Sequence, residues 1–376
     1  MCLGREFLPV PDEGAVRTRL ALGSEPMRTQ VTELLGVEHP VLQAPMASVA
    51  TPELAAAVSA AGGLGAVGSA MLALDELRAQ AAAVRASTDR PFQLNFFCHQ
   101  PHPVEAAEAG AARARIAPLY EELGVGEPPE PSVPPIAFDA PRLKALLEIS
   151  PPVVSFHFGL PGSDALAACH EAGITVLATA TTVAEARDLA ERGVDAVVAQ
   201  GAEAGGHRGS YLVDGDDGPV GTLALVPQVV DAVSVPVVAA GGIADGRGLA
   251  AALVLGAGAA QVGTAFVACP ESGAPPLYRE ALSAADAERT TITRAYSGRP
   301  ARVLRNRGTE EIAEPLPYPA QMSLTAVLRG AGRDPADFVP LFAGQGALLA
   351  HAAPAAEVVA TLVAEADNAL GGLARD

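Results

Sequence analysis

The stretch DAVVAQGAEAGGH, residues 195–207, says more about fold and function than any other part of the chain. Its apolar first half is typical of a strand buried on both faces, as in a parallel sheet. Glycines follow at positions 201, 205 and 206, and glycine lets the backbone approach a ligand closely. An imidazole comes next at His207, and this side chain is well suited to proton transfer near neutral pH. The stretch therefore predicts a buried strand that ends at a ligand site.

The same arrangement recurs along the chain, where short apolar runs alternate with alanine-rich helical stretches. Strands are expected at 41–46, 64–69, 92–97, 153–159, 175–180, 196–200, 237–241 and 259–263. Helices are expected at 52–61, 74–86, 163–172, 182–192, 222–233 and 245–255. Eight buried strands alternating with helices predict an α/β fold of the TIM (β/α)8 barrel type. A doubly wound open sheet is the alternative.

Two segments, 101–140 and 270–324, interrupt this alternation. The first combines a helical stretch with a proline-rich run, and the second combines a helix at 276–285 with a strand-like run at 290–295. Both follow strand ends on the side where barrel active sites form. We therefore expect them to build a smaller inserted capping domain.

The barrel itself is then expected to comprise 28–100, 141–269 and 325–376, with a helical last part over 323–373. Residues 1–27 form an N-terminal extension that we expect to be flexible, and Met27 is an alternative start.

Charge and composition limit the possible partners. The chain has 376 residues, with 25 basic and 43 acidic side chains and a net charge of −18. Nucleic acid and anionic membranes both need basic surfaces, so neither is an expected partner. No apolar run reaches the ~20 residues that span a bilayer, and the start lacks a secretory signal. We expect a cytoplasmic monomer or homodimer that acts on a small molecule.

Metal and disulfide chemistry are not indicated. The four cysteines, at positions 2, 98, 169 and 269, form no C-x-x-C pair. His99 and His102 resemble a metal pair only weakly, and no carboxylate cluster accompanies them. We assign no metal.

Two further strand ends carry glycine. Gly241 and Gly242 end one predicted strand, and Gly263 and Thr264 end the next. In a barrel these are the usual positions for a phosphate, which is bound by backbone N–H groups and helix N-termini. Tight turns without a ligand are the alternative.

Amides end three otherwise apolar strands, at Gln43, Asn95 and Gln200. A buried amide costs free energy unless it is hydrogen-bonded. Three amides at one barrel mouth suggest a ligand rich in donors and acceptors, such as a flavin ring, and hydrogen bonds to neighbouring loops are the alternative.

His157 lies between two phenylalanines and is either a core histidine or a site residue. No G-x-S-x-G motif is present and no G-x-G-x-x-G follows the first strand, which disfavours a serine hydrolase and a Rossmann site.

Taken in order, these motifs resemble the nitronate monooxygenase family, formerly called 2-nitropropane dioxygenases. The resemblance runs from about residue 31 to the C-terminus. It depends on the segments QAPM (43–46), NFF (95–97), SFHFG (155–159), QGAEAGGH (200–207), GGIA (241–244), QVGT (261–264), PYP (317–319) and AGQ (343–345). Members of this family are FMN-containing TIM barrels with a smaller capping domain.

The resemblance implies a set of site residues. His207 matches the active-site histidine, and the substrate side is formed by His157, Tyr318 and Met46. The expected FMN-binding residues are Ala44, Pro45, Met46, Asn95, Gln200, Gly205, Gly206, Gly241, Gly242, Gln261, Gly263 and Thr264. One branch of the family carries a tyrosine and a lysine after the PYP element, and Met322 and Ala326 stand near those positions here.

The resemblance also implies the reaction. FMN would oxidise an alkyl nitronate, or a nitroalkane, with O₂ to give a carbonyl compound and nitrite. Two alternatives remain. One is an FMN-dependent NAD(P)H reductase of enoyl-thioesters or quinones on the same scaffold, and the other is a non-catalytic protein that binds flavin or another phosphorylated ligand.

Overall fold

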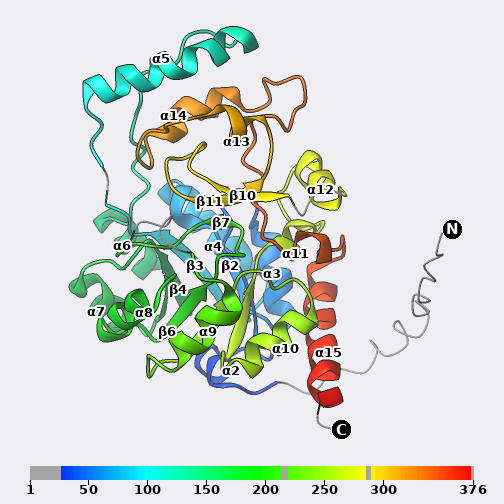
Figure 1. Cartoon of the computed structure of the whole chain (residues 1–376). Helices are drawn as coiled ribbons and strands as arrows, with labels where there is room; N and C mark the ends of the chain where they lie inside the picture. The colour runs from blue at the N-terminus through cyan, green and yellow to red at the C-terminus, as the bar shows by residue number, and fades with distance from the viewer. Residues whose placement is uncertain (1–26, 101, 214–218, 285–288, 374–376) are drawn as a thin grey trace, which may run out of the picture.

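Eight parallel strands form the central sheet of the protein, in the order β1-β9-β8-β6-β5-β4-β3-β2. The computed structural model describes residues 27–100, 102–213, 219–284 and 289–373 (Figure 1). The strands are β1 (Val41–Gln43), β2 (Gly65–Val67), β3 (Phe92–Phe97), β4 (Val153–His157), β5 (Thr175–Ala180), β6 (Ala196–Gln200), β8 (Val237–Ala240) and β9 (Ala259–Val262). A parallel bridge between Leu42 and Leu64 joins the first and last strands. The sheet is therefore closed, the predicted barrel is confirmed, and the open-sheet alternative is wrong.

Helices surround this barrel. They are α3 (Pro52–Ala60), α4 (Leu74–Ser87), α6 (Ala140–Ile149), α7 (Ser163–Glu171), α8 (Val183–Glu191), α9 (Thr222–Val230), α10 (Gly246–Val254) and α15 (Ala355–Leu373). Side-chain oxygens of Thr51, Thr182 and Asp245 cap three of them by accepting a backbone N–H of the first turn. No helix among the described residues is long and apolar enough to cross a membrane.

The lower end of the barrel is filled by side chains. A short helix, α2 (Gln30–Leu35), places Val31 and Leu35 against Leu42, Leu64 and other interior residues. These side chains are at most 4% exposed. The packed end leaves the carboxyl ends of the strands as the opening of the barrel.

A cap lies over that opening, at the top of Figure 1. Its three-stranded sheet has the order β10 (Thr290–Thr293), β11 (Ala301–Leu304) and β7 (Gly206–His207). Its helices are α5 (Ala106–Leu123), α12 (Pro276–Ser283), α13 (Arg307–Glu311) and α14 (Gln321–Thr325). Ile116, Tyr120, Val303 and Phe338 belong to a separate buried cluster. We propose this cluster as the core of the capping domain, which then takes in Phe338 as well as 101–140 and 270–324.

Several local predictions need correction. The strand expected at 41–46 ends at Gln43, since Pro45 has no N–H for the ladder. Helix is not continuous over 323–373: glycines and prolines recur between 330 and 354, and regular helix resumes only at α15. The helices α2 and α6 and the strands β7 and β11 were not predicted. The expected flexibility of 1–27 falls outside the described residues, apart from Met27.

Close packing of α3 on the barrel depends on Gly65. A Cβ atom at this position would lie 1.9 Å from the backbone oxygen of Ala55 in α3. We expect Gly65→Ala to lower the free energy of unfolding by about 2–3 kcal/mol, because backbone must move to admit the methyl group. Denaturant unfolding measures this change.

Gly110→Ala is the matched control, since nothing lies within 4 Å of a Cβ atom at Gly110 in helix α5. There the same methyl group should stabilise the protein by ~0.5–1 kcal/mol, because alanine is the better helix former. Equal effects at the two positions would contradict the packing argument.

Candidate active site at the barrel mouth

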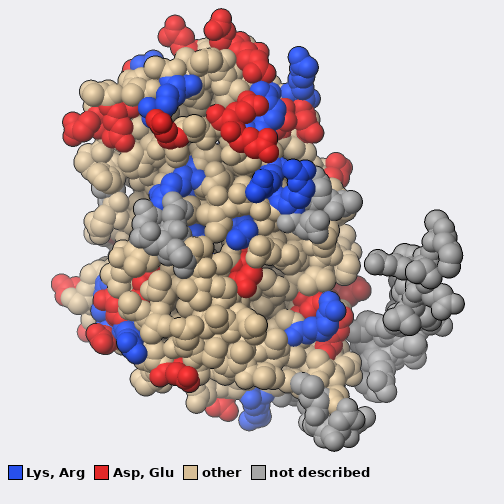
Figure 2. Space-filling view, viewed as in Figure 1, with Lys and Arg blue, Asp and Glu red and all other residues tan. Residues whose placement is uncertain are grey.

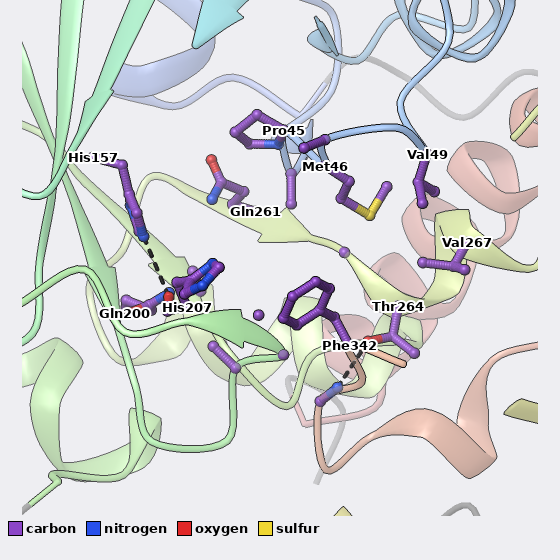
Figure 3. A pocket seen from close by; sticks show the side chains of 18 of the residues that line it. Pro45, Met46, Val49, His157, Gln200, His207, Gln261, Thr264, Val267 and Phe342 are labelled. Atoms are coloured by element: carbon purple, nitrogen blue, oxygen red, sulfur yellow. Dashed lines mark hydrogen bonds between the residues drawn. The ribbon is translucent and has the colours of Figure 1, made fainter. Parts of the chain in front are cut away.

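A cavity of about 290 Å³ opens at the carboxyl ends of the barrel strands and extends under the cap. Figure 3 shows Pro45 and Met46 on one side of it, with Thr264 and Phe342 on the other. Every site residue that the family resemblance implies lines this cavity: Ala44, Pro45, Met46, Asn95, His157, Gln200, Gly205, Gly206, His207, Gly241, Gly242, Gln261, Gly263, Thr264 and Tyr318. The barrel brings them together because each lies at or near the carboxyl end of a strand or comes from the cap.

The amide side chains divide into two groups. The first group keeps an atom free for a ligand, and the second has both amide atoms hydrogen-bonded within the protein. Asn95 donates its Nδ2 to Ser155, at 3.0 Å from Oγ, which leaves its Oδ1 for a ligand. The Gln261 side chain lines the cavity and has no hydrogen bond to another described residue. Gln43, by contrast, is buried and pairs both amide atoms with Ala66. Gln43 therefore satisfies a neighbouring strand and does not line the cavity.

Gln200 belongs to the second group, although it lines the cavity. Its Nε2 donates to the carbonyl of His207 at 3.0 Å, and its Oε1 accepts the N–H of Gly209 at 2.8 Å. Both ends of the amide are thus engaged by the segment that carries His207. The observed role of this side chain is to hold that segment at the end of β6.

The glycine-rich end of the cavity has unused backbone donors. The N–H groups of Gly242 and Gly263 have no acceptor in the described part of the chain. Segment 343–346 packs closely here: a Cβ atom at Gly205 would lie 2.6 Å from the nitrogen of Gly344. Gly242 is exposed and Gly263 is half-buried, so both N–H groups are accessible to a ligand. Free backbone N–H groups at glycine-rich strand ends are typical of sites that bind anionic oxygens.

The N-terminus of α10 does not contribute to that anion site. Asp245 caps it by accepting the N–H of Gly248 at 3.1 Å, and Glu365 accepts the N–H of Gly246 at 2.9 Å. Two carboxylates already occupy this helix end, so it cannot also bind a phosphate. The sequence placed Asp245 correctly at the start of the helix, but the free donors lie at Gly242, before this helix, and at Gly263, after β9.

His207 is carried by the cap, not by a barrel strand. It lies on β7, which pairs with β11 and places His207 opposite Ala301. Its Nε2 lies 2.9 Å from Ser297 Oγ. Burial, together with the positive charge of Arg299, lowers the pKa of His207 to about 3. The imidazole is therefore neutral at physiological pH. The sequence had suggested a pKa near 7, and the structure corrects that expectation.

His157 faces the same cavity, which decides between its two sequence interpretations. It ends β4, and its Nε2 lies 3.2 Å from the carbonyl oxygen of His207. Since that oxygen can only accept, Nε2 carries the proton and donates. Burial lowers the pKa of His157 to about 4, so this imidazole is neutral as well.

An aromatic wall completes the site, in which His157 and Tyr318 line the cavity and Phe158 and His99 pack against them. The Phe158 ring lies 4.5 Å from the ring of His157 and 5.6 Å from that of Tyr318, between centroids. The guanidinium carbon of Arg299 lies 3.9 Å from the centre of the Phe158 ring. His99 stacks edge-on to Tyr318 at 4.8 Å, and neither of its ring nitrogens bonds a described residue. No cluster of metal-ligating side chains occurs among the described residues.

Sequence reasoning missed the contribution of residues 289–307. Ser297 and Arg299 contact the histidine segment, and Tyr296 lines the cavity. This run contains six arginines and no acidic residue in a chain of net charge −18, and that asymmetry could have marked it. Figure 2 shows basic side chains across the middle of the visible face, with acidic ones above and below.

A closed β/α barrel with a capped, glycine-lined cavity and two neutral imidazoles in its lining places the protein among the TIM-barrel enzymes. Residues 28–365 match the family model described as nitronate monooxygenase. A nitronate monooxygenase of Pseudomonas aeruginosa is 48% identical over 348 residues, which cover 90% of this chain and 99% of the relative. The chain belongs to the nitronate monooxygenase family of oxidoreductases, and this family is flavin-dependent.

Solved structures agree with this assignment. The chain resembles a nitroalkane oxidase from Streptomyces ansochromogenes with a TM-score of 0.84 and 41% identity, over 92% of this chain and 100% of that chain. It also resembles FabK from Thermotoga maritima, with a TM-score of 0.72 and 34% identity, over 93% and 99% of the two chains.

Burial of His99 should make the fold sensitive to acid. Its pKa is lowered from 6.5 to about 4, chiefly by burial. As pH falls from 6.5 towards 4, the unfolded chain takes up a proton at this residue and the folded chain does not, so stability falls. We expect His99→Leu to flatten the pH dependence of the unfolding free energy in this window by up to about 1.4 kcal/mol per pH unit. Denaturant titrations across the window measure it.

His351→Leu serves as the control, because His351 is exposed. A steep slope that persists unchanged in His99→Leu would show that His99 does not carry the effect.

Proposed function

We propose that the protein is an FMN-dependent enzyme that oxidises small alkyl nitronates with O₂ to a carbonyl compound and nitrite. The observation that carries the proposal is one cavity that joins unused backbone donors at its glycine end to a neutral, half-buried His207. Membership of the nitronate monooxygenase family supports the same reaction. FMN, when bound, would supply the redox chemistry by accepting electrons from the nitronate and passing them to O₂.

The cavity fits FMN in its polar groups. The N–H groups of Gly242 and Gly263 would hold the phosphate at the glycine end. Asn95 Oδ1 and the Gln261 amide would hydrogen-bond the polar edge of the ring. The segment 44–46, which leaves β1 at Pro45, would border the ring on its apolar side. These are the groups that the described chain leaves without partners of its own.

The substrate side combines neutral donors with nearby positive charge. A nitronate is already an anion, so it needs hydrogen-bond donors more than a strong base. His207 is neutral, and a hydrogen bond from its imidazole would orient the anion. Arg299 stacks on Phe158 in the wall beside His207 and its positive charge favours anions there. Cap residues such as Tyr318 and Phe342 cover this side of the cavity, and shielding from water would strengthen these interactions.

The direct test uses the colour of the purified protein. A flavin-loaded preparation is yellow, and mixing it anaerobically with propionate 3-nitronate should bleach the flavin absorbance. Admitting O₂ should restore the colour with release of nitrite. A preparation that cannot be loaded with FMN, or one that the nitronate does not reduce, would overturn the proposal.

The same experiment with NADH tests the second candidate, an FMN-dependent NAD(P)H reductase. The likeness to FabK structures is the observation that keeps this candidate, and it is weaker in TM-score and identity than the likeness to the nitroalkane oxidase. Rapid anaerobic bleaching by NADH, without bleaching by nitronate, would favour the reductase.

His207 should matter for turnover and not for cofactor binding. We expect His207→Asn to lower kcat with a nitronate by about 100-fold or more, because the donor to the substrate is lost or misplaced. Steady-state nitrite release measures kcat, and the visible spectrum should show unchanged FMN content. His351→Asn, at an exposed site, is the control. Unchanged kinetics in His207→Asn would remove the proposed role.

Gly205 should matter for cofactor binding. A methyl group there meets backbone atoms of residues 343 and 344 at 2.6–2.7 Å, so Gly205→Ala should push segment 343–346 away from the cavity. We expect the FMN content per protein to fall several-fold. Gly371→Ala, with nothing within 4 Å, is the control. Full FMN content in Gly205→Ala would contradict the proposed cradle.

A further inference from the structure

The cap and the histidine segment are joined by a set of short contacts. Ser297 Oγ lies 2.9 Å from His207 Nε2. The N–H of Arg208 donates to the carbonyl of Pro300 at 2.8 Å. The Arg299 guanidinium donates to the backbone carbonyls of Arg208 and Ser210. Residues 297–300 therefore hold the segment 207–210 along its length, and Ser297 is the member that reaches the imidazole.

Ser297 can decide which nitrogen of His207 carries the proton. A neutral imidazole has one donor nitrogen and one acceptor nitrogen, and the partner at one nitrogen fixes the role of the other. Ser297 is 6% exposed, so solvent does not compete strongly for its hydroxyl group. Burial also keeps His207 neutral, so only one of its two ring nitrogens carries a proton.

The surroundings of Ser297 Oγ favour one arrangement. The N–H of Arg299 donates to this oxygen at 3.3 Å. The hydroxyl proton has two acceptors available, His207 Nε2 at 2.9 Å and the carbonyl of Arg299 at 3.4 Å. The shorter contact is near the ideal length and the longer one is at the limit for a hydrogen bond. The hydroxyl therefore donates to Nε2, and Nε2 is the acceptor.

The other ring nitrogen is then the one left for a ligand. Nδ1 of His207 has no hydrogen bond to any residue in the described ranges, and His207 lines the cavity. With Nε2 occupied as an acceptor, Nδ1 carries the proton.

We propose that Ser297 is a positioning residue that fixes the tautomer of His207, so that the imidazole presents Nδ1–H to the cavity as a hydrogen-bond donor. This assignment concerns the chain's own residues and holds with or without a ligand. Its consequence for catalysis rests on the proposed function: an Nδ1–H group can bind an oxygen of an anionic nitronate, whereas removing a proton from a neutral nitroalkane would need the opposite tautomer.

The tautomer can be measured directly by nitrogen NMR. In protein labelled with ¹⁵N-histidine, protonated and unprotonated ring nitrogens have well-separated shifts, and comparison with His207→Asn identifies the His207 signals. We expect a protonated Nδ1 and an unprotonated Nε2 in the wild type. Ser297→Ala should shift both signals towards intermediate values, because the tautomers then interconvert. Ser297→Thr keeps the hydroxyl and should retain the wild-type pattern.

Two results would overturn the proposal: a protonated Nε2 in the wild type, or a Ser297→Ala spectrum identical to that of the wild type. Ser87→Ala, at an exposed position on α4, is the control for removal of a hydroxyl group. If Ser297→Ala does not fold, the wild-type spectrum alone still decides between the two tautomers.

Kinetics give a second readout. Ser297→Ala should lower kcat with a nitronate roughly tenfold, which is the usual effect of losing one hydrogen bond, with a smaller change in KM. Ser297→Thr should recover most of the loss. If the protein turns over no nitronate at all, the proposed function fails, while the NMR result still tests the role of Ser297.

Discussion

The site depends on one carbonyl group, that of His207. Gln200, at the end of β6, donates to it at 3.0 Å, and His157, at the end of β4, donates at 3.2 Å. These two bonds attach β7, a strand of the cap sheet, to two barrel strands that lie on either side of β5. Buried donors of this kind are costly to leave unpaired, so docking of the cap and placement of the imidazole are a single event. Two residues that the sequence offered as ligand contacts thus serve to position the third.

This dependence shows which parts of the site could be predicted from sequence. The barrel strands, the glycine ends and His207 were predictable because each is a local pattern: an apolar run, then a glycine or polar residue. The pairing of β7 with β11 was not predictable, since β7 has only two residues and its partner lies about ninety positions away. The engagement of the Gln200 amide likewise depends on Gly209 folding back over the strand end. Ser297 and Arg299 enter only through that long-range pairing, so no local pattern marks their role.

Docking of the cap on the barrel also sets the protonation states in the site. Burial lowers the pKa values of His99, His157 and His207 well below 6.5, and the charge of Arg299 lowers them further. Three neutral imidazoles beside the guanidinium of Arg299 leave this aromatic wall with a positive charge, in a chain whose overall charge is −18. Such a wall favours a small anion over a neutral molecule, and it does so without a base that would need to be charged.

Phe158 shows how the backbone is arranged to build this wall. Its φ is +67°, in the left-handed region that bulky residues seldom adopt, at a cost of about 1–3 kcal/mol. The turn ends β4 directly after His157 and breaks the alternation of side chains along the strand. The Phe158 ring is 2% exposed and lies against Arg299 at 3.9 Å, a cation–π contact that offsets part of the strain. Without the turn, successive side chains would point to opposite faces of the sheet. The strained residue thus places the Phe158 ring against His157 and Tyr318, which line the cavity, and it gives Arg299 of the cap an aromatic ring to pack on.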